Sequence, residues 1–353
     1  MLLEGLQLPL TTPFYSDGRL NLSKLEYNVR RYSKTPVAGF VVLSENGEAT
    51  MLSDEETRQT LESVANAAAS EKALLAGVAR DSLAGTMDMA EFAAKAGYDA
   101  VLIKRPSPFQ ENSDHRAVKA MTTYFQAVAD RSALPVVLYS TGPEAGEALP
   151  VEIVIALAEH PRIIGLVDVF CRKGRFEKIL SGTTHVEDEV TVTTVFAAVT
   201  ERMRRQCEAA ADELIAASAL TGGAILTVAP TKGISKTRTK KVGFQLLGAS
   251  TRDMLDALHA GAVGAMPSFA AAAPQATYEV LAAWKDGDQG LAEEKQARLE
   301  RIAERVEEEL GVAGIKFGCD LNGYFGGSPR SPQLPLTAAE REEIDALMHG
   351  LRN

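Results

Sequence analysis

Short apolar runs that alternate with longer amphipathic stretches limit the fold of this chain more than any other feature. Eight such runs follow one another: LQLPLT, GFVVLS, ALLAGVA, AVLIK, PVVLYS, IIGLVDV, GFQLLGA and AVGAMPS. Apolar runs of this length are typical of parallel strands that are covered on both faces. Eight strand-then-helix units within about 280 residues predict an α/β fold, the closed (β/α)8 TIM barrel.

The stretches between the runs carry helix signals. They are residues 53–70, 84–96, 114–131, 150–160 and 251–260. Ser53 and Glu56 form a capping-box pattern, and the acidic Asp54 and Glu55 suit the positive end of the helix dipole. The alternative fold is an open doubly wound sheet. The chain has neither a G-x-G-x-x-G motif that opens a helix nor a P-loop motif, which favours the barrel and indicates no nucleotide cofactor.

Two regions fall outside the eight units. Residues 182–242 form a long insertion between the sixth and seventh strands, with a helical stretch at roughly 197–218 and the basic run TKGISKTRTKK. We expect the basic run to be a solvated loop that leads into the seventh strand, and a phosphate or carboxylate clamp is the alternative. We predict that the barrel spans residues 1–288. The pattern of residues 289–353 predicts a C-terminal helical extension of about three helices, which we expect to serve for packing or oligomer contacts.

The charge and the cysteines restrict partners and location. The 47 acidic residues against 37 basic ones give a formal charge of −10, which repels nucleic acid and anionic lipid. The sequence has no apolar stretch of the roughly 18 residues that a membrane helix needs, and its N-terminus lacks secretory-signal features. Cys171, Cys207 and Cys319 are too widely spaced for a disulfide framework or a C-x-x-C metal site. We therefore expect a cytoplasmic protein without a metal or cofactor, whose partner is a small molecule.

Polar residues gather where the predicted strands end. They are Thr11, Thr12 and Pro13 after the first strand, Ser44, Glu45, Asn46, Gly47 and Glu48 after the second, Lys104 and Arg105 after the fourth, Tyr139 and Ser140 after the fifth, and Asp168 after the sixth. In a TIM barrel the catalytic groups stand at the C-terminal ends of the strands. We therefore expect the active site at this end of the barrel.

Seven segments in order carry a family resemblance: TTPFYSDGRLN, GFVVLSENGEATMLSDEE, ALLAGVA, AGYDAVLIKRPSPF, LPVVLYSTGPEAG, RIIGLVDV and GIKFGCDLNGYFGGSPRSPQLPLT. With them the chain resembles the dihydrodipicolinate synthase and N-acetylneuraminate lyase family over nearly its whole length, except residues 182–242. The resemblance implies a class I aldolase mechanism, in which a lysine on the sixth strand forms a Schiff base with pyruvate or another 2-oxo acid. It also implies a homo-oligomer, a dimer or a tetramer.

The family's catalytic positions are altered in this chain. The resemblance places Val167, in GLVD, at the position of the Schiff-base lysine, and valine has no nitrogen with which to form an imine. It places Glu45 and Asn46 on the two threonines of the turn that binds the keto-acid carboxylate. Tyr139, on the position of the proton-relay tyrosine, is retained. The resemblance thus predicts a barrel that cannot form the family's Schiff base on the sixth strand.

Three residues are candidate catalytic groups: Tyr139, Glu45 and Lys104. Tyr139 is either a general acid or a packing aromatic. The Glu45 carboxylate would repel a ligand carboxylate about 4 Å away by roughly 4 kcal/mol at an effective dielectric of 20, unless Lys104 or Arg105 pairs with it. Lys104 is either an imine-forming amine or a surface lysine, and the choice depends on whether its side chain faces the barrel interior.

The candidate substrate-binding residues are Thr12, Ser44, Asn46, Gly47, Glu48, Ser140 and Asp168. For Asp168 a structural partnership with a backbone group or an arginine is the main alternative to a role as a base. Lys316, in GIKF, mimics the missing lysine pattern, but it follows the eighth strand and we interpret it as a decoy.

Two functions remain open from the sequence. One is a divergent lyase or aldolase, acting on a carbon–carbon or carbon–oxygen bond of a small 2-oxo acid or related oxygenated substrate. The other is a non-catalytic paralogue that binds a ligand or a partner at the old site.

Overall fold

A computed structural model describes residues 1–109, 115–142, 148–170, 172–218 and 236–351 of the chain. Eight parallel strands close into a barrel in the order β1-β2-β3-β4-β5-β6-β9-β10. They are β1 (Gly5–Pro9), β2 (Gly39–Val42), β3 (Ala73–Gly77), β4 (Ala100–Lys104), β5 (Val136–Ser140), β6 (Ile163–Asp168), β9 (Gln245–Gly248) and β10 (Gly264–Ala265). The eight-stranded barrel predicted from the sequence is confirmed.

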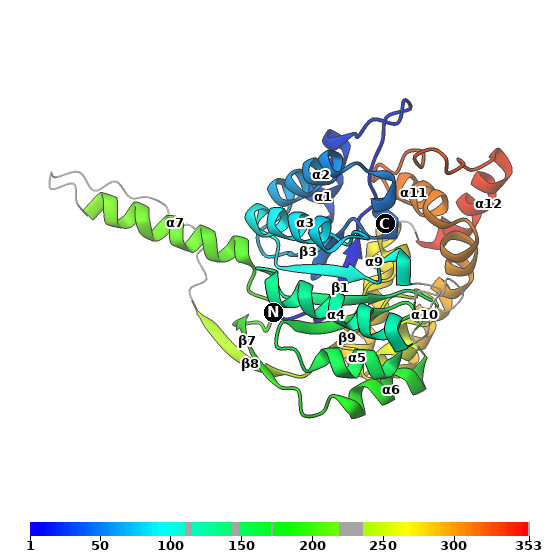
Figure 1. Cartoon of the computed structure of the whole chain (residues 1–353). Coiled ribbons are helices and arrows are strands. Elements are labelled where there is room, and N and C mark those ends of the chain that lie inside the picture. The colour runs from blue at the N-terminus through cyan, green and yellow to red at the C-terminus, as the bar shows by residue number, and fades with distance from the viewer. Residues whose placement is uncertain (110–114, 143–147, 171, 219–235, 352–353) are drawn as a thin grey trace.

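Helices surround this barrel (Figure 1). They are α1 (Leu22–Tyr32), α2 (Asp54–Ala67), α3 (Leu83–Ala96), α4 (His115–Arg131), α5 (Val151–Ala158), α6 (Lys173–Gly182), α8 (Met254–His259) and α9 (Pro274–Lys285), with short 3-10 turns at Glu45–Gly47, Ala49–Met51, Ser107–Phe109, Ser268–Ala271 and His349–Leu351. The predicted capping box is present, because the Ser53 hydroxyl accepts from the backbone of Glu56 and the Glu56 carboxylate accepts from the backbone of Ser53.

Side chains alternate along the strands between the barrel interior and the helix layer. In β5, Val137 and Tyr139 belong to the interior cluster, whereas Val136 and Leu138 pack in the core between strands and helices. Val167 of the neighbouring β6 belongs to the same interior cluster and pairs in register with Tyr139. Because a strand has a period of two, this register decides which side chains reach the mouth of the barrel from inside.

The insertion between β6 and β9 forms a small sheet and a helix. Its strands β7 (Asp188–Thr193) and β8 (Thr237–Val242) are antiparallel, and α7 (Glu201–Ser218) projects away from the barrel in Figure 1. The prediction of a solvated loop for the whole basic run was wrong for its last five residues, 237–241. They lie in β8, because its backbone pairs with β7 while most of its side chains stay exposed. Residues 231–235 of the run lie outside the described residues.

The insertion packs on the N-terminal face of the barrel. Val190 and Val192 of β7 cluster with Leu2, which precedes the first strand. At the start of α7, the Arg202 guanidinium donates to the carbonyl of Ala68 at 2.8 Å. The insertion therefore lies at the opposite end from the polar strand ends.

The C-terminal extension contains the three predicted helices. They are α10 (Gln289–Ala303), which continues into a π-helical turn (Glu304–Glu309), α11 (Gly311–Leu321) and α12 (Ala338–Met348). A domain boundary at residue 288 stays a prediction. Within the described part of the chain, no helix has both the length and the apolar character needed to cross a membrane.

Glu307, in the π-helical turn, fastens the extension to the barrel. Its buried carboxylate accepts hydrogen bonds from the hydroxyl and the backbone N–H of Thr251, which follows β9, and from the backbone N–H of Phe269, which follows β10. Burial raises the pKa of Glu307 from 4.5 to about 7, although these hydrogen bonds favour the charged form.

We predict that this carboxyl makes unfolding pH-dependent. Because its pKa is higher in the folded state, the folded chain binds the proton more tightly, and stability falls as pH rises from 4.5 to about 7. The loss is about 3 kcal/mol at most. Urea unfolding at pH 5 and pH 8 should show that the free energy of unfolding falls more between the two pH values in the wild-type chain than in Glu307→Gln. Identical pH profiles of the two proteins would contradict the assignment.

Candidate active site

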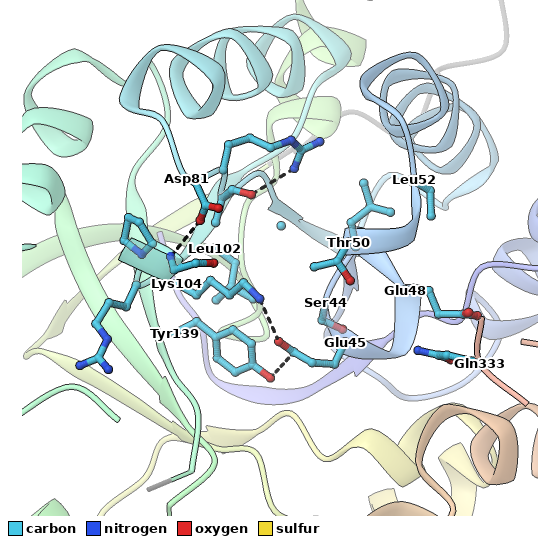
Figure 2. A pocket seen from close by; sticks show the side chains of 18 residues that line it. Ser44, Glu45, Glu48, Thr50, Leu52, Asp81, Leu102, Lys104, Tyr139 and Gln333 are labelled. Atoms are coloured by element: carbon cyan, nitrogen blue, oxygen red, sulfur yellow. Dashed lines mark hydrogen bonds and ion pairs between the residues drawn. The ribbon is translucent and has the colours of Figure 1, made fainter. Parts of the chain in front are cut away.

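A cavity of about 470 Å³ opens at the C-terminal ends of β2 to β5 (Figure 2). Its lining includes Leu43, Ser44, Glu45, Glu48, Thr50, Leu52, Arg80, Asp81, Leu102, Lys104, Arg105, Tyr139 and Gln333. The lining thus combines charged and hydroxyl groups with apolar side chains. A few polar groups among apolar ones are typical of a small-molecule site.

The three predicted catalytic residues meet in this cavity. The Tyr139 hydroxyl donates a hydrogen bond of 2.5 Å to Glu45 Oε2, and Glu45 Oε1 lies 3.9 Å from Lys104 Nζ. Figure 2 shows Lys104 and Tyr139 reaching toward Glu45 from neighbouring strands. Lys104 and Tyr139 are register partners at the ends of β4 and β5, so their side chains leave the barrel at the same level. The Lys104 side chain therefore points into the cavity.

The turn after β2 brings Glu45 to this place. The turn is bracketed by Leu43, with φ 66°, and Glu48, with φ 52°, both in the left-handed region that such residues rarely adopt. Gly77 of the neighbouring β3 leaves room for the left-handed conformation of Leu43, because a Cβ at position 77 would lie 2.1 Å from the carbonyl oxygen of Leu43. A glycine at position 77 is therefore needed for the turn.

The base of the cluster is apolar. Val167 is fully buried inside the barrel, next to Tyr139 on one side and Leu247 on the other. None of the residues of β6 (Ile163–Asp168) is a lysine. Among the described residues that line the cavity, Lys104 is the only lysine.

The model of the dihydrodipicolinate synthetase family matches residues 2–206 and 227–350, which is most of the chain. The chain belongs to this family. Its curated relatives include a 4-hydroxy-tetrahydrodipicolinate synthase of Acidiphilium cryptum (strain JF-5), 24% identical over 99% of this chain and 98% of the relative. Another is an L-threo-3-deoxy-hexylosonate aldolase of Hypocrea jecorina, 25% identical over 99% of this chain and 95% of the relative.

Solved structures agree on the fold. The dihydrodipicolinate synthase of Acinetobacter baumannii, solved with pyruvate, superposes with a TM-score of 0.76 at 19% identity and covers 99% of this chain and 100% of that one. The enzyme from Aquifex aeolicus superposes with a TM-score of 0.75 at 16% identity, over 99% and 98% of the two chains. At these identities the likeness shows the fold of the family member and no more.

Two of the predicted substrate-binding residues, Ser44 and Glu48, line the cavity of this family member. The Ser44 hydroxyl is buried and has no hydrogen-bond partner within the described part of the chain. A buried hydroxyl without a partner costs free energy, so this group is suited to a polar atom of a ligand. The Glu48 carboxylate is instead bound by two residues of the C-terminal extension, the Lys316 ammonium and the backbone N–H of Arg330.

Three other predicted binding residues hold the turn from behind and are not part of the cavity lining. The Thr12 hydroxyl donates to the carbonyl of Gly47 at 2.7 Å. The amide of Asn46 donates to the carbonyls of Pro9, at 3.2 Å, and Ser268, at 2.9 Å. These contacts fix the backbone of the turn and leave Glu45 free to face the cavity.

Ser140 and Asp168 also lie away from the cavity lining, in a buried network around Arg175 of α6. The Arg175 guanidinium donates to Asp168 Oδ2 at 2.5 Å, to the carbonyl of Leu149 at 2.7 Å and to the Ser140 hydroxyl at 3.3 Å. Burial raises the pKa of Asp168, and the Arg175 charge opposes this. This is the partnership with an arginine that the sequence reading offered for Asp168.

Arg175→Met should therefore destabilise the fold. The substitution strands the Asp168 carboxylate without its counter-charge, which costs about 3–5 kcal/mol for a buried pair. Urea unfolding measures the loss, and the loss should shrink at low pH, where a protonated Asp168 needs no partner. Arg172→Met, at the exposed N-cap residue of the same helix, is the matched control. Equal stability of the two variants would rule out a structural role for the Arg175–Asp168 pair.

The sequence reading missed five polar residues of the cavity lining: Thr50, Arg80, Asp81, Ser107 and Gln333. Arg80 and Asp81 directly follow the third strand run, where polar residues deserved the same weight as at the other strand ends. Asp81 Oδ1 accepts from the backbone N–H of Ser107 at 2.8 Å and so fixes the segment after β4. Gln333 reaches the cavity from the C-terminal extension, and no local pattern announces it.

Proposed function

We propose that this chain is a divergent lyase or aldolase that acts on a small 2-oxo acid or a related oxygenated substrate, without a Schiff-base lysine on the sixth strand. The observation that carries the proposal is the meeting of Lys104, Glu45 and Tyr139 in one cavity at the strand ends. The aldolase among the relatives supports this reaction class.

In the proposed reaction Lys104 supplies the amine. Its uncharged Nζ attacks the carbonyl carbon of the 2-oxo acid, water leaves, and the resulting protonated imine withdraws electrons from the neighbouring carbon–carbon bond. The amine must first lose a proton, and the Glu45 carboxylate 3.9 Å away can accept it. Val167, on the position that the resemblance gives to the family's lysine, takes no part.

Glu45 and Tyr139 together provide the proton transfers. When the bond between C3 and C4 breaks, the C4 hydroxyl loses its proton to this pair, the fragment that carries C4 leaves as an aldehyde, and the electrons of the bond enter the imine to form an enamine. Return of a proton to C3, followed by hydrolysis, releases the 2-oxo acid and frees the amine. The 2.5 Å hydrogen bond between the two side chains suits a pair that shares a proton.

The same charges restrict the orientation of the substrate. By itself the Glu45 carboxylate would repel a substrate carboxylate about 4 Å away by roughly 4 kcal/mol, and Lys104, whose Nζ lies 3.9 Å from Glu45 Oε1, offsets only part of this repulsion. The carboxylate end of the substrate is therefore expected to lie away from the Ser44–Glu48 turn.

A panel of 4-hydroxy-2-oxo acids tests the proposal on the full chain. We expect release of the 2-oxo acid, measured with a coupled dehydrogenase. When borohydride is added, we also expect an intact-mass increase equal to one bound 2-oxo acid less one oxygen atom, because imine formation expels water and reduction adds two hydrogens. The chain would then be an enzyme that uses an imine. Turnover without any mass increase would keep the lyase assignment and remove Lys104 as the imine-forming amine.

The second candidate is a non-catalytic paralogue that binds a ligand or partner at the old site, which the absence of lysine from β6 supports. A ligand that raises the unfolding temperature without turnover or adduct would favour it. The homo-oligomeric state and the cytoplasmic location stay expectations from the sequence, and light scattering of the purified chain measures the first.

A further inference from the structure

Lys316, in α11 of the C-terminal extension, is fully buried beside the turn that carries Glu45. Its ammonium group forms an ion pair with Glu48 Oε1, donates to the carbonyl of Ser328 at 3.1 Å and lies 4.5 Å above the centre of the Phe14 ring. The residue interpreted as a decoy from the sequence thus contacts the site. A buried ammonium is unfavourable unless it is paired, so Lys316 and Glu48 depend on each other.

The second oxygen of Glu48 is held by the same extension. The backbone N–H of Arg330 donates to Glu48 Oε2 at 2.8 Å. The Arg330 guanidinium binds both carboxylate oxygens of Glu56 at 2.7 Å and the carbonyl of Met51 at 3.0 Å. The C-terminal extension therefore binds both the end of the turn of residues 44–48 and the start of α2.

Glu48 connects these contacts to the catalytic cluster of Lys104, Glu45 and Tyr139. Its backbone N–H donates to the carbonyl of Glu45 at 2.9 Å, and its own backbone is in the left-handed region. Rarely adopted backbone conformations persist where the surroundings hold them. If Glu48 is released, the turn can relax to an ordinary conformation, and Glu45 then moves relative to Lys104 and Tyr139.

We propose that Lys316 is a positioning residue for the candidate active site: it holds Glu48 and, through the turn of residues 44–48, sets the place of Glu45. Lys316 is not part of the cavity lining and takes no direct part in the reaction. The inference rests on the proposed function, in which Glu45 works with Lys104 and Tyr139.

Two variants separate positioning from stability. Lys316→Met leaves the Glu48 carboxylate buried without its counter-charge, so it lowers the urea midpoint as well as the order of the turn. The double variant Lys316→Met with Glu48→Gln removes both charges and keeps similar shapes, so it should unfold near the wild-type midpoint. Lys240→Met is the control, because it breaks an ion pair with Glu4, before β1 at the N-terminal end of the barrel.

Each protein is measured by urea unfolding, by hydrogen exchange of peptides that span residues 43–52, and by kcat and KM. In the double variant we expect amide exchange of the turn to be at least about tenfold faster. We expect kcat to fall roughly 10- to 100-fold, with a smaller change in KM, because a misplaced proton acceptor slows the chemistry more than binding. The control should match the wild type in all three.

Wild-type exchange together with wild-type kcat in the double variant would overturn the positioning role. If the wild-type chain shows no turnover on any substrate, the proposed function fails, and the exchange measurement alone then decides the role of Lys316. Faster amide exchange of the turn in that case supports the positioning role of Lys316, and unchanged exchange refutes it.

Discussion

Lys104→Met should lower kcat/KM at least about 1,000-fold and abolish the borohydride-trapped adduct, because the variant keeps the apolar stem but has no nitrogen to attack the carbonyl. The fold should be little affected. Lys104 is one-third exposed and pairs with Glu45 at 3.9 Å, a weak ion pair that contributes little to stability. Steady-state kinetics and the intact mass after reduction measure the two effects.

A matched control is Lys178→Met, at a lysine of α6 outside the cavity lining. It should retain wild-type turnover and the adduct. An adduct that persists in Lys104→Met would show that another lysine forms the imine. Turnover near the wild-type value would show that no amine at position 104 is needed.

Tyr139→Phe should reduce kcat by about 100- to 10,000-fold, the range expected when a positioned acid or base is lost. The substitution removes only the hydroxyl that donates to Glu45 at 2.5 Å. The ring stays packed in the barrel interior, so the urea midpoint should change little. Rate and stability measured on the same preparation separate a catalytic role from packing.

Tyr98→Phe is the control for this prediction. It also removes a buried hydroxyl, which donates to the carbonyl of Leu61 in α2 at 3.0 Å, and neither residue is part of the cavity lining. It should leave kcat unchanged. If Tyr139→Phe lowers the rate no more than Tyr98→Phe does, Tyr139 is a packing residue.

The barrel was predictable because its strands carry their own signal. Strands buried on both faces need continuous apolar runs, and each run in the sequence became a strand. The strand β8 (Thr237–Val242) escaped prediction because it lacks such a run. Most of its side chains are exposed, and only backbone pairing with β7 shows that it is a strand.

The catalytic cluster was predictable in composition but not in geometry. Parallel strands in a barrel all end at one mouth, so Lys104, Glu45 and Tyr139 had to be near one another. Whether Lys104 faces the cavity depends on a single-residue register, which sequence pattern does not fix. The Lys316–Glu48 pair joins residues 268 positions apart in the chain (316 minus 48), and nothing near either residue signals such a contact.

The decisive measurement is peptide mapping of the chain after borohydride reduction in the presence of its 2-oxo acid product. We expect the reduced 2-oxo acid adduct on the peptide that contains Lys104 and on no other. An adduct on any other lysine would place the chemistry elsewhere and contradict the proposed roles of Glu45 and Tyr139.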